Sequence, residues 1–157
     1  MANSNRPRRS VLYMPGSNAR ALDKGRTLAA DALVIDLEDS VAPAAKNEAR
    51  QQIVAALGEG GYGHRELIIR VNALTTPWGF DDIATISGTS ADAILIPKVD
   101  SAEAVRQAAT IMDEAGAPKT MAIWCMMETP RAILHAKKIA DSHSRMGGFV
   151  MGTSDLA

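Results

Sequence analysis

The feature that most constrains the fold is a regular alternation between short apolar runs and longer segments with helical spacing. The apolar runs predict about six strands, at residues 10–14, 32–37, 67–72, 93–97, 121–128 and 148–152. The segments between them predict five helices, at residues 19–29, 44–57, 80–86, 102–115 and 130–141. Alternation of this kind is typical of a parallel sheet with right-handed helical crossovers. The sequence therefore predicts an α/β fold.

Two parallel architectures fit this pattern. An open doubly wound sheet suits a chain of 157 residues. A (β/α)₈ TIM barrel usually has about 250 residues, so only about six βα units of such a barrel would be present. No repeat or linker divides the chain, and the last predicted strand is followed only by "GTSDLA". We therefore expect one domain over residues 10–157, after a flexible N-terminus at residues 1–9.

Composition argues against several classes of protein. The chain is 46% hydrophobic and 22% charged, as globular domains are, and its net charge of −1 argues against nucleic-acid or anionic-membrane partners. No apolar run approaches the length of a membrane span. A single cysteine, Cys125, and three scattered histidines argue against a disulfide framework and a zinc site. No apolar signal region follows the basic start, so we expect a cytoplasmic protein.

Charged side chains gather where the predicted strands end. The motif "DLED" at 36–39 closes the second strand, Arg70 lies at the end of the third, and Lys98 follows the fourth. Glu128 closes the fifth strand, and Asp155 follows the sixth. Both architectures place their active sites at the C-terminal ends of the strands. The charged edge is therefore the predicted functional edge.

Strand alternation sorts the acids of this edge. Asp36 and Glu38 fall on one face of their strand, and Asp39 falls on the opposite face. If these faces look into a barrel, Arg70 meets carboxylates in a confined space, and a buried arginine must be paired. We expect Arg70 to hold a substrate carboxylate or carbonyl oxygen through its planar fork while Asp36 or Glu38 holds Arg70. A purely structural ion pair remains the alternative.

Glu128 and Asp155 lie about one βα repeat apart, so their strands are expected to be neighbours, roughly 4.8 Å apart. Two carboxylates at that separation repel each other unless a cation lies between them. Mg²⁺ fits because it takes one or two protein carboxylates and fills its octahedron with water and substrate oxygens. The alternatives for Glu128 are a solvated strand-end acid or a helix cap. Lys98 is expected to be a surface lysine whose carbon chain lies along apolar surface.

Five segments, taken in order, resemble one known family. They are "RRSVLYMPGSNARALDKGRTLAADALVIDLEDSVAPAAKNEAR", "IRVNALTTPWGFDDI", "AILIPKVDSAEAV", "METPRAILHAKKIA" and "GTSDLA". Together they are similar to the HpcH/HpaI aldolase and citrate lyase β-subunit family, and within it to CitE-like proteins and malyl-CoA or citryl-CoA lyases. The resemblance extends from Arg8 over nearly the whole chain.

The resemblance implies a (β/α)₈ barrel that cleaves or forms a carbon–carbon bond in a 3-hydroxyacyl-CoA thioester and uses Mg²⁺ as cofactor. Arg70, in "RVN", corresponds to the substrate-binding arginine of the family. Glu128, in "METP", and Asp155, in "GTSDLA", correspond to its metal ligands. Relatives usually have asparagine where Ser154 stands. Relatives also form trimers or hexamers, so a homo-oligomer is expected for a full-length protein.

Two further segments receive roles from the same resemblance. Asp36, Glu38 and Asp39 fill the acidic motif beside the site, and we expect them to orient Arg70 and the waters around Mg²⁺. Pro15, Gly16 and Ser17 are expected to lie near the substrate or its CoA moiety.

Length is the main departure from the family, because relatives continue through about two more strands and a C-terminal segment beyond the motif that ends this sequence. We therefore expect a fragment of a longer gene product that is not stable or active alone. Two other hypotheses stay open at this point. One is a non-enzymatic, receiver-like α/β domain with five strands in an open sheet. The other is an inactive truncated remnant.

Overall fold

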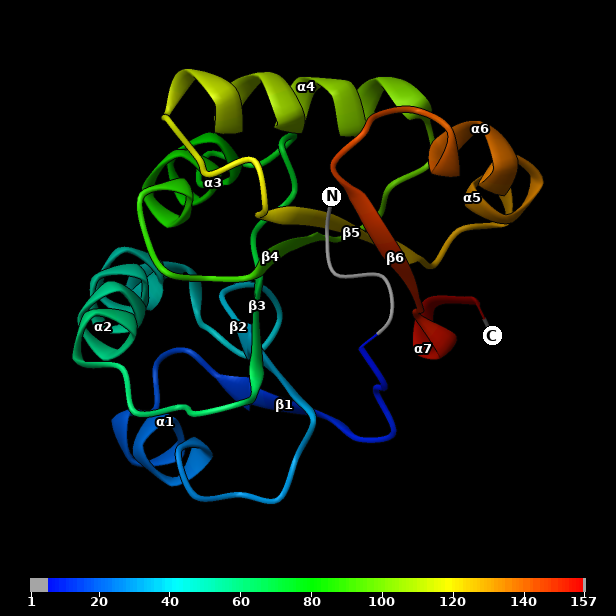
Figure 1. The fold of residues 1–157 in the computed structure, drawn as a ribbon. Coiled ribbons are helices and arrows are strands. Elements are labelled where there is room, and N and C mark those ends of the chain that lie inside the picture. The colour runs from blue at the N-terminus through cyan, green and yellow to red at the C-terminus, as the bar shows by residue number, and fades with distance from the viewer. Residues whose placement is uncertain (1–5, 157) are drawn as a thin grey trace.

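Six parallel strands follow one another around a curved sheet in the order in which they occur in the sequence (Figure 1). The computed structural model describes residues 6–156. Its strands are β1 (Val11–Pro15), β2 (Ala32–Asp36), β3 (Glu66–Arg70), β4 (Ala93–Ile96), β5 (Ala122–Met127) and β6 (Met146–Met151). Its helices are α1 (Ala19–Gly25), α2 (Lys46–Glu59), α3 (Gly79–Ser87), α4 (Ala102–Glu114), α5 (Pro130–Leu134), α6 (Ala136–Ala140) and α7 (Thr153–Leu156), with a 3₁₀ turn η1 (Pro43–Ala45) before α2.

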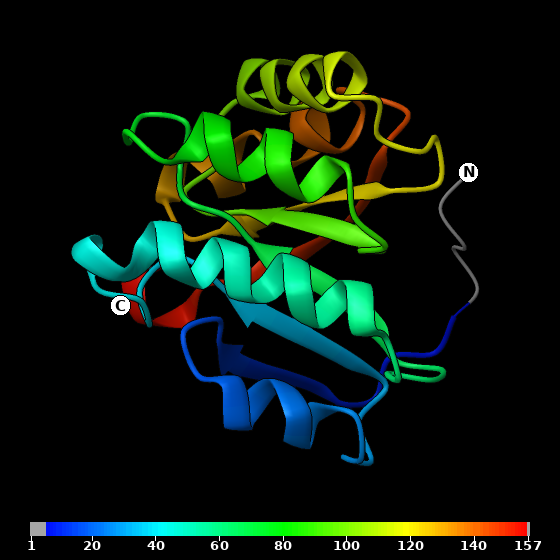
Figure 2. The same cartoon turned by 90° about the vertical axis from the view of Figure 1, so that its left-hand side faces the viewer.

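The strand order decides between the two predicted architectures. A doubly wound sheet reverses its strand order at a switch point and carries helices on both faces. Here the order β1 to β6 is consecutive, every pairing is parallel, and the helices form a layer on one side of the strands (Figure 2). This is the arrangement of a (β/α)₈ barrel, of which the described residues provide six strands. The five-stranded open sheet of the receiver-like hypothesis is therefore wrong.

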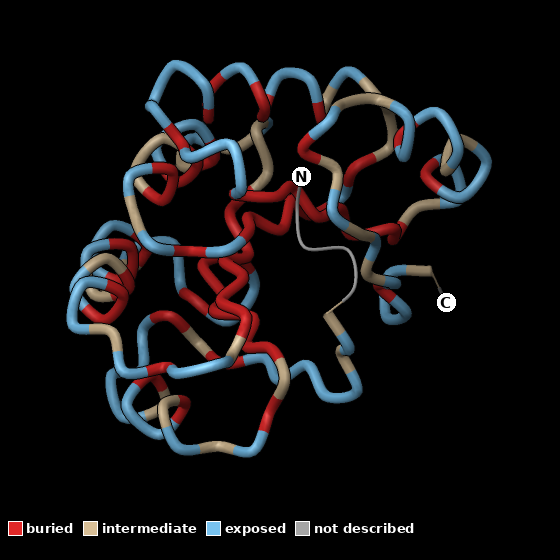
Figure 3. The backbone as a smooth tube through the Cα atoms, in the orientation of Figure 1, coloured by how far each residue is buried: buried red, intermediate tan, exposed pale blue. Residues whose placement is uncertain are grey.

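The helix-facing side of the sheet forms the larger apolar core. Alternate strand residues such as Leu33, Ile69 and Ile94 are fully buried there, together with helix residues such as Ile53 and Ile83. Cys125 also lies in this cluster as a free thiol, and burial raises its pKa to about 12. Figure 3 shows the resulting pattern: buried strands inside, and helices that expose their outer sides. Cys125 therefore packs as part of the apolar core.

The concave side of the sheet has an apolar core of its own. Its buried residues come only from strands: Ala32, Val34, Ile68, Ala93, Leu95, Ala122, Trp124 and Met126. Because successive side chains in a strand point to opposite faces, the residues that continue these rows, Asp36 and Arg70, face the same side at the C-terminal ends. The barrel interior is thus apolar in its middle and charged at one end.

The segment before β1 lies against the other end of the barrel. The Arg8 guanidinium pairs with Glu66 and lies over the Trp124 ring, 4.9 Å from its centroid. The backbone N–H of Arg9 donates to Asp31 at 2.8 Å. Residues 1–5, which belong to the N-terminus predicted to be flexible, lie outside the described residues. That prediction stays a prediction.

The observed helices differ from the predicted ones in two places. The predicted helix at 130–141 is divided at His135 into α5 and α6, and the His135 Nδ1 atom lies 3.1 Å from the carbonyl oxygen of Asp100. The one-turn helix α7 follows β6, where no helix was predicted. None of the helices within residues 6–156 combines the length and the apolar composition that a membrane crossing requires.

The apolar interior of the barrel can be tested with Leu95→Ala. Leu95 is fully buried on the concave side, so we expect a loss of about 2–5 kcal/mol in the free energy of unfolding. Leu134→Ala is the matched control, since Leu134 is 84% exposed, and its effect should stay within about 0.5 kcal/mol. Urea denaturation measures both, and equal midpoints for the two variants would contradict a packed interior.

Candidate active site

Arg70 lies at the centre of the charged edge of the barrel. It ends β3, and its register partner on β2 is Asp36. The guanidinium donates from Nε to Asp36 Oδ1 and from the NH2 atom to Asp36 Oδ2, both at 2.7 Å. Asp36 is 2% exposed and Arg70 is 8% exposed. This two-point contact between buried charges fixes the orientation of the arginine, as predicted from strand alternation.

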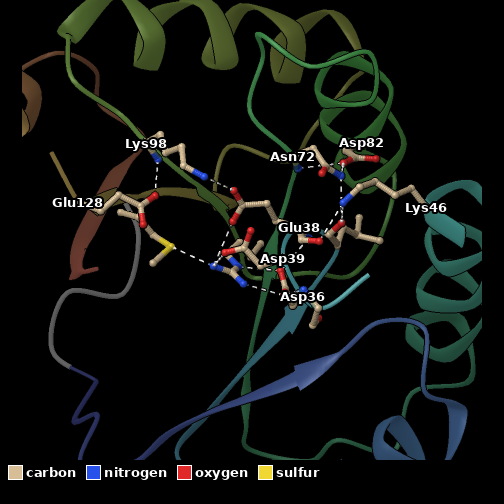
Figure 4. Close-up of polar contacts among 12 residues, drawn as sticks. Asp36, Glu38, Asp39, Lys46, Asn72, Asp82, Lys98 and Glu128 are labelled. Carbon is tan, nitrogen blue, oxygen red and sulfur yellow. Dashed lines mark hydrogen bonds and ion pairs between the residues drawn. The ribbon is translucent and has the colours of Figure 1, made fainter. Parts of the chain in front are cut away.

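The two other acids of "DLED" also approach Arg70. The NH1 atom lies 3.1 Å from Glu38 Oε2 and 3.6 Å from Asp39 Oδ2 (Figure 4). Asp39 begins the loop after β2 and approaches Arg70, although alternation placed it on the opposite face. Strand β2 ends at Asp36, whose carboxylate accepts from the backbone N–H groups of Glu38 at 2.8 Å and Ser40 at 3.0 Å. This turn ends the alternation on which the prediction rested.

Burial and pairing have opposite effects on the ionisation of these groups. Burial alone would raise the pKa of Asp36, but hydrogen bonds from Arg70 and from the Glu38 and Ser40 amides outweigh it and hold the pKa below its usual value. Burial raises the pKa of Glu38, although Lys98 and Arg70 oppose the shift. For Arg70, burial favours a lower pKa, yet Asp36, Glu38 and Asp39 raise it. The Asp36–Arg70 pair is thus charged at neutral pH.

Two uncharged side chains complete the surroundings of Arg70. The Tyr13 ring on β1 has its centroid 5.5 Å from the guanidinium carbon, and the sulfur of Met126 on β5 lies 3.7 Å from NH1. Neither contact was predicted from the sequence. Met126 could have been found, because it shares a strand face with Glu128. Nothing in the sequence pattern marks Tyr13.

Glu128 follows β5 and is buried, with 6% of its surface exposed. Its Oε1 atom accepts from the backbone N–H of Lys98 at 2.6 Å. Gly152 packs against the other side: a Cβ atom added there would lie 2.4 Å from Glu128 Cβ and 2.6 Å from Oε2. Only glycine therefore allows this position of the carboxylate, and the reading of Glu128 as a solvated acid is wrong.

Glu128 and Asp155 line the same cavity of about 290 Å³. Asp155 belongs to α7 and is exposed. Arg70, Tyr13 and Asp39 line this cavity and also a second one of about 340 Å³, to which Asp36, Ser40, Met14 and Pro15 contribute. The two cavities therefore adjoin at Arg70. The structure brings together the predicted arginine, the acidic motif and both predicted metal ligands.

The donor set of this cavity fits a hard divalent cation. Among the residues that line it, three carboxylates, Asp39, Glu128 and Asp155, accompany one cationic side chain, Arg70. Within residues 6–156, no group of three or more acidic, histidine or cysteine side chains is placed to enclose a metal. Mg²⁺ does not need such a cage, because it commonly takes one or two carboxylates and keeps water or substrate oxygens as its other ligands. Glu128 and Asp155 are the residues that would hold it.

The predicted "PGS" segment is only partly available to a ligand. Pro15 lines the 340 Å³ cavity, and Ser17 is exposed. Gly16 is buried: its N–H donates to the Asp36 carbonyl at 2.8 Å, and its carbonyl accepts from Gln52 at 2.7 Å. A Cβ atom on Gly16 would lie 2.8 Å from that Asp36 carbonyl oxygen. Gly16 therefore packs the β1 turn against β2.

Further polar residues, Lys46, Asn72 and Asp82, form a hydrogen-bonded group beside the "DLED" turn (Figure 4). The Lys46 ammonium donates to the carbonyl oxygens of Leu37 at 2.9 Å and Glu38 at 2.8 Å. The Asn72 amide donates to the same Leu37 carbonyl and to Asp82. Strict strand alternation would put Asn72 on the same face as Arg70. However, β3 ends at Arg70, and Asn72 contacts α3 instead.

Comparison with known proteins places this geometry in a family. A family model described as HpcH/HpaI aldolase/citrate lyase matches residues 9–157. The chain is 48% identical over 157 residues to a (3S)-malyl-CoA thioesterase of Cereibacter sphaeroides, covering 100% of this chain and 53% of that protein. It is 35% identical over 159 residues to an L-malyl-CoA/beta-methylmalyl-CoA lyase of the same species, covering 97% of this chain and 50% of the relative.

A solved structure supports the barrel. The citrate lyase beta subunit from M. tuberculosis, complexed with oxaloacetate and magnesium, superposes with a TM-score of 0.75 at 26% identity, covering 96% of this chain and 61% of that chain. The chain spans about half the length of the curated relatives that it matches.

The stability of the Asp36–Arg70 pair can be tested with Asp36→Asn. Removing one partner of a buried pair costs about 3–5 kcal/mol, and we expect the lower end because Glu38 and Asp39 remain near Arg70. Asp141→Asn removes an exposed pair with Lys137 and should cost less than about 1 kcal/mol. Chemical denaturation at pH 7 measures both, and equal losses would refute the burial argument.

Asp36→Asn also tests how the stability contribution of the Asp36 carboxylate depends on pH. The folded-state pKa of Asp36 is lowered from 3.8, so the ionised carboxylate stabilises the fold above that pH, and its contribution is lost as the pH falls through the lowered folded-state value. The stability advantage of the wild type over Asp36→Asn should be constant from about pH 5 to 7 and shrink below about pH 4. Denaturation at stepped pH values measures it, and an advantage that grows on acidification would reverse the sign.

Proposed function

The chain belongs to the HpcH/HpaI aldolase/citrate lyase family, and on that basis we propose that it provides the catalytic edge of a Mg²⁺-dependent carbon–carbon lyase. The proposed substrate is a 3-hydroxyacyl-CoA thioester of the malyl-CoA or citryl-CoA type. The products are acetyl-CoA and a 2-oxoacid. An assembly of the whole protein into trimers or hexamers, and a cytoplasmic location, are part of the same proposal.

One observation carries this proposal: Arg70, Glu128 and Asp155 line a single cavity at the C-terminal ends of the strands. A fixed guanidinium and two hard-oxygen donors in one cavity suit a substrate that carries both a carboxylate and an oxygen on the next carbon. The relative crystallised with oxaloacetate and magnesium, at 26% identity, is consistent with such a substrate.

Cleavage breaks the bond between the α and β carbons of the thioester. The β-hydroxyl loses its proton and becomes the carbonyl of the 2-oxoacid, while the bonding electrons pass to the α carbon and give the enolate of acetyl-CoA. That carbon then takes up a proton. Negative charge therefore develops on the substrate oxygens, and groups that stabilise this charge accelerate the reaction.

The residues of this chain have separate parts in that scheme. Arg70 stabilises the developing negative charge, and its contact with Asp36 removes the need to reorient during the reaction. Glu128 and Asp155 would hold Mg²⁺, which would supply Lewis-acid polarisation of a substrate oxygen. Asp36, Glu38 and Asp39 keep the guanidinium in place.

Hydrolysis of the same thioester is a second candidate. It is favoured by the 48% identity to a relative named (3S)-malyl-CoA thioesterase. Hydrolysis leaves the carbon–carbon bond intact and releases a hydroxyacid and free CoA. Both reactions use the same bound substrate, so product analysis separates them.

The experiment incubates the natural gene product with malyl-CoA and with citryl-CoA, in Mg²⁺ or in EDTA, and separates the products by chromatography. We expect acetyl-CoA and a 2-oxoacid in Mg²⁺ and neither in EDTA. Free CoA with intact hydroxyacid would instead support hydrolysis. No turnover of either thioester would contradict both candidates.

Glu128→Gln tests the metal assignment, since it keeps the shape of the side chain and removes its charge. We expect kcat/KM to fall about 100-fold or more and Mg²⁺ to bind at least about tenfold more weakly in calorimetry. Glu103→Gln changes an exposed acid on α4 and should leave both quantities unchanged. Activity that survives Glu128→Gln would remove Glu128 from the metal site.

A further inference from the structure

Lys98 has an unusual backbone conformation at the edge of the site. Among residues 6–156 it is the one residue other than glycine with a positive φ, at 52°. A lysine is strained there, because its Cβ atom approaches the backbone carbonyl. Strain of this kind persists only where the surrounding structure fixes it, and it gathers at functional sites. The contacts of Lys98 show what this conformation does.

In this backbone conformation the Lys98 N–H points at Glu128 and donates to Oε1 at 2.6 Å. Hydrogen bonds to a carboxylate are stronger than those between neutral groups. In the part of the chain that the structure describes, no hydrogen bond is formed to Oε2, which faces Gly152. One oxygen of Glu128 is thus held by the protein, and the other is left for a cation.

The side chain of Lys98 reaches the other half of the site. Its ammonium donates to Glu38 Oε1 at 3.1 Å, while Glu38 Oε2 lies 3.1 Å from the Arg70 NH1 atom. Figure 4 shows Lys98 between Glu128 and Glu38. The Lys98 side chain is 50% exposed, but Glu38 is 11% exposed. The sequence predicted a surface lysine and did not predict the contact with Glu38.

We propose that Lys98 is a positioning residue with two separable roles. Its left-handed backbone positions the Glu128 carboxylate for Mg²⁺, and its ammonium positions Glu38 and, through Glu38, the guanidinium of Arg70. This inference deepens the proposed function and rests on it for its catalytic readout. It assigns no contact between Lys98 and the substrate.

Two substitutions separate the roles. Lys98→Asn removes the ammonium but keeps a residue that tolerates positive φ, whereas Lys98→Val removes the ammonium and disfavours that conformation. Lys119→Asn is the matched control, because Lys119 is 86% exposed and lies outside the site. If Lys98→Val does not fold, as judged by circular dichroism, Lys98→Ala replaces it, since alanine also disfavours positive φ.

Mg²⁺ calorimetry and steady-state kinetics measure the two roles. Lys98→Asn should bind Mg²⁺ within about threefold of the wild type but lose about tenfold in kcat/KM, because Glu38 and Arg70 are no longer held. Lys98→Val should lose about 10–100-fold in Mg²⁺ affinity as well. Wild-type Mg²⁺ affinity in Lys98→Val would overturn the backbone role, and unchanged kcat/KM in Lys98→Asn would overturn the side-chain role.

Crystal structures of both variants without metal test the positioning of Glu128 independently of Mg²⁺ binding and of turnover. We expect Glu128 to keep its hydrogen bond to the residue 98 amide in Lys98→Asn and to lose it in Lys98→Val. If the wild type neither binds Mg²⁺ nor turns over a thioester, the proposed function fails. The Glu128 hydrogen bond then decides the backbone role, and the position of Glu38 relative to Arg70 in Lys98→Asn decides the side-chain role: an unmoved Glu38 would overturn it. A Glu128 carboxylate in the same place in both variants would overturn the backbone role.

Discussion

The buried contact between Asp36 and Arg70 is the interaction on which the arrangement of the site depends. A guanidinium inside a barrel is stable only when it is paired, and Asp36 pairs with it through two hydrogen bonds of 2.7 Å. The parallel register of β2 and β3 places the two residues directly opposite each other. With Arg70 fixed in this way, its NH1 atom is left to meet Glu38, Asp39 and the cavity that contains Glu128.

This arrangement concentrates negative charge in a small volume. Arg70 and Lys98 neutralise only part of the charge of the surrounding carboxylates, so a divalent cation is the natural complement of the cavity. A cation held by Glu128 and Asp155 would share this cavity with the Arg70 guanidinium. In a site of this kind, fixed charges accelerate a reaction mainly by stabilising the charge that develops in the transition state.

Much of the fold was predictable because side chains repeat their direction every two residues in a strand and about every 3.6 residues in a helix. Alternation along the strands predicted that Asp36 or Glu38 would hold Arg70, and Asp36 forms the two-point contact. The pattern alone could not decide between a barrel and an open sheet, because strand order is a tertiary property. The resemblance to a known family made that choice, and the consecutive order of β1 to β6 confirms it.

Predictions failed where strands end, because period-two alternation stops there. Asp39 turns back toward Arg70 because the Asp36 carboxylate captures two loop amides. Asn72 turns toward α3 because β3 ends at Arg70, and its side-chain amide donates to Asp82. The role of Lys98 depends on a backbone angle and on two partners far away in the sequence, which no local pattern contains.

The most direct test of a metal site at this edge is a crystal structure of the natural gene product with Mn²⁺ in place of Mg²⁺. Mn²⁺ prefers the same hard oxygen ligands, and its anomalous scattering locates it without assumptions about the protein. We expect one peak bonded to the Glu128 and Asp155 carboxylates, in the cavity that Arg70 also lines. A peak bonded instead to Asp36 or Glu38, or no peak in this cavity at saturating Mn²⁺, would contradict the assignment.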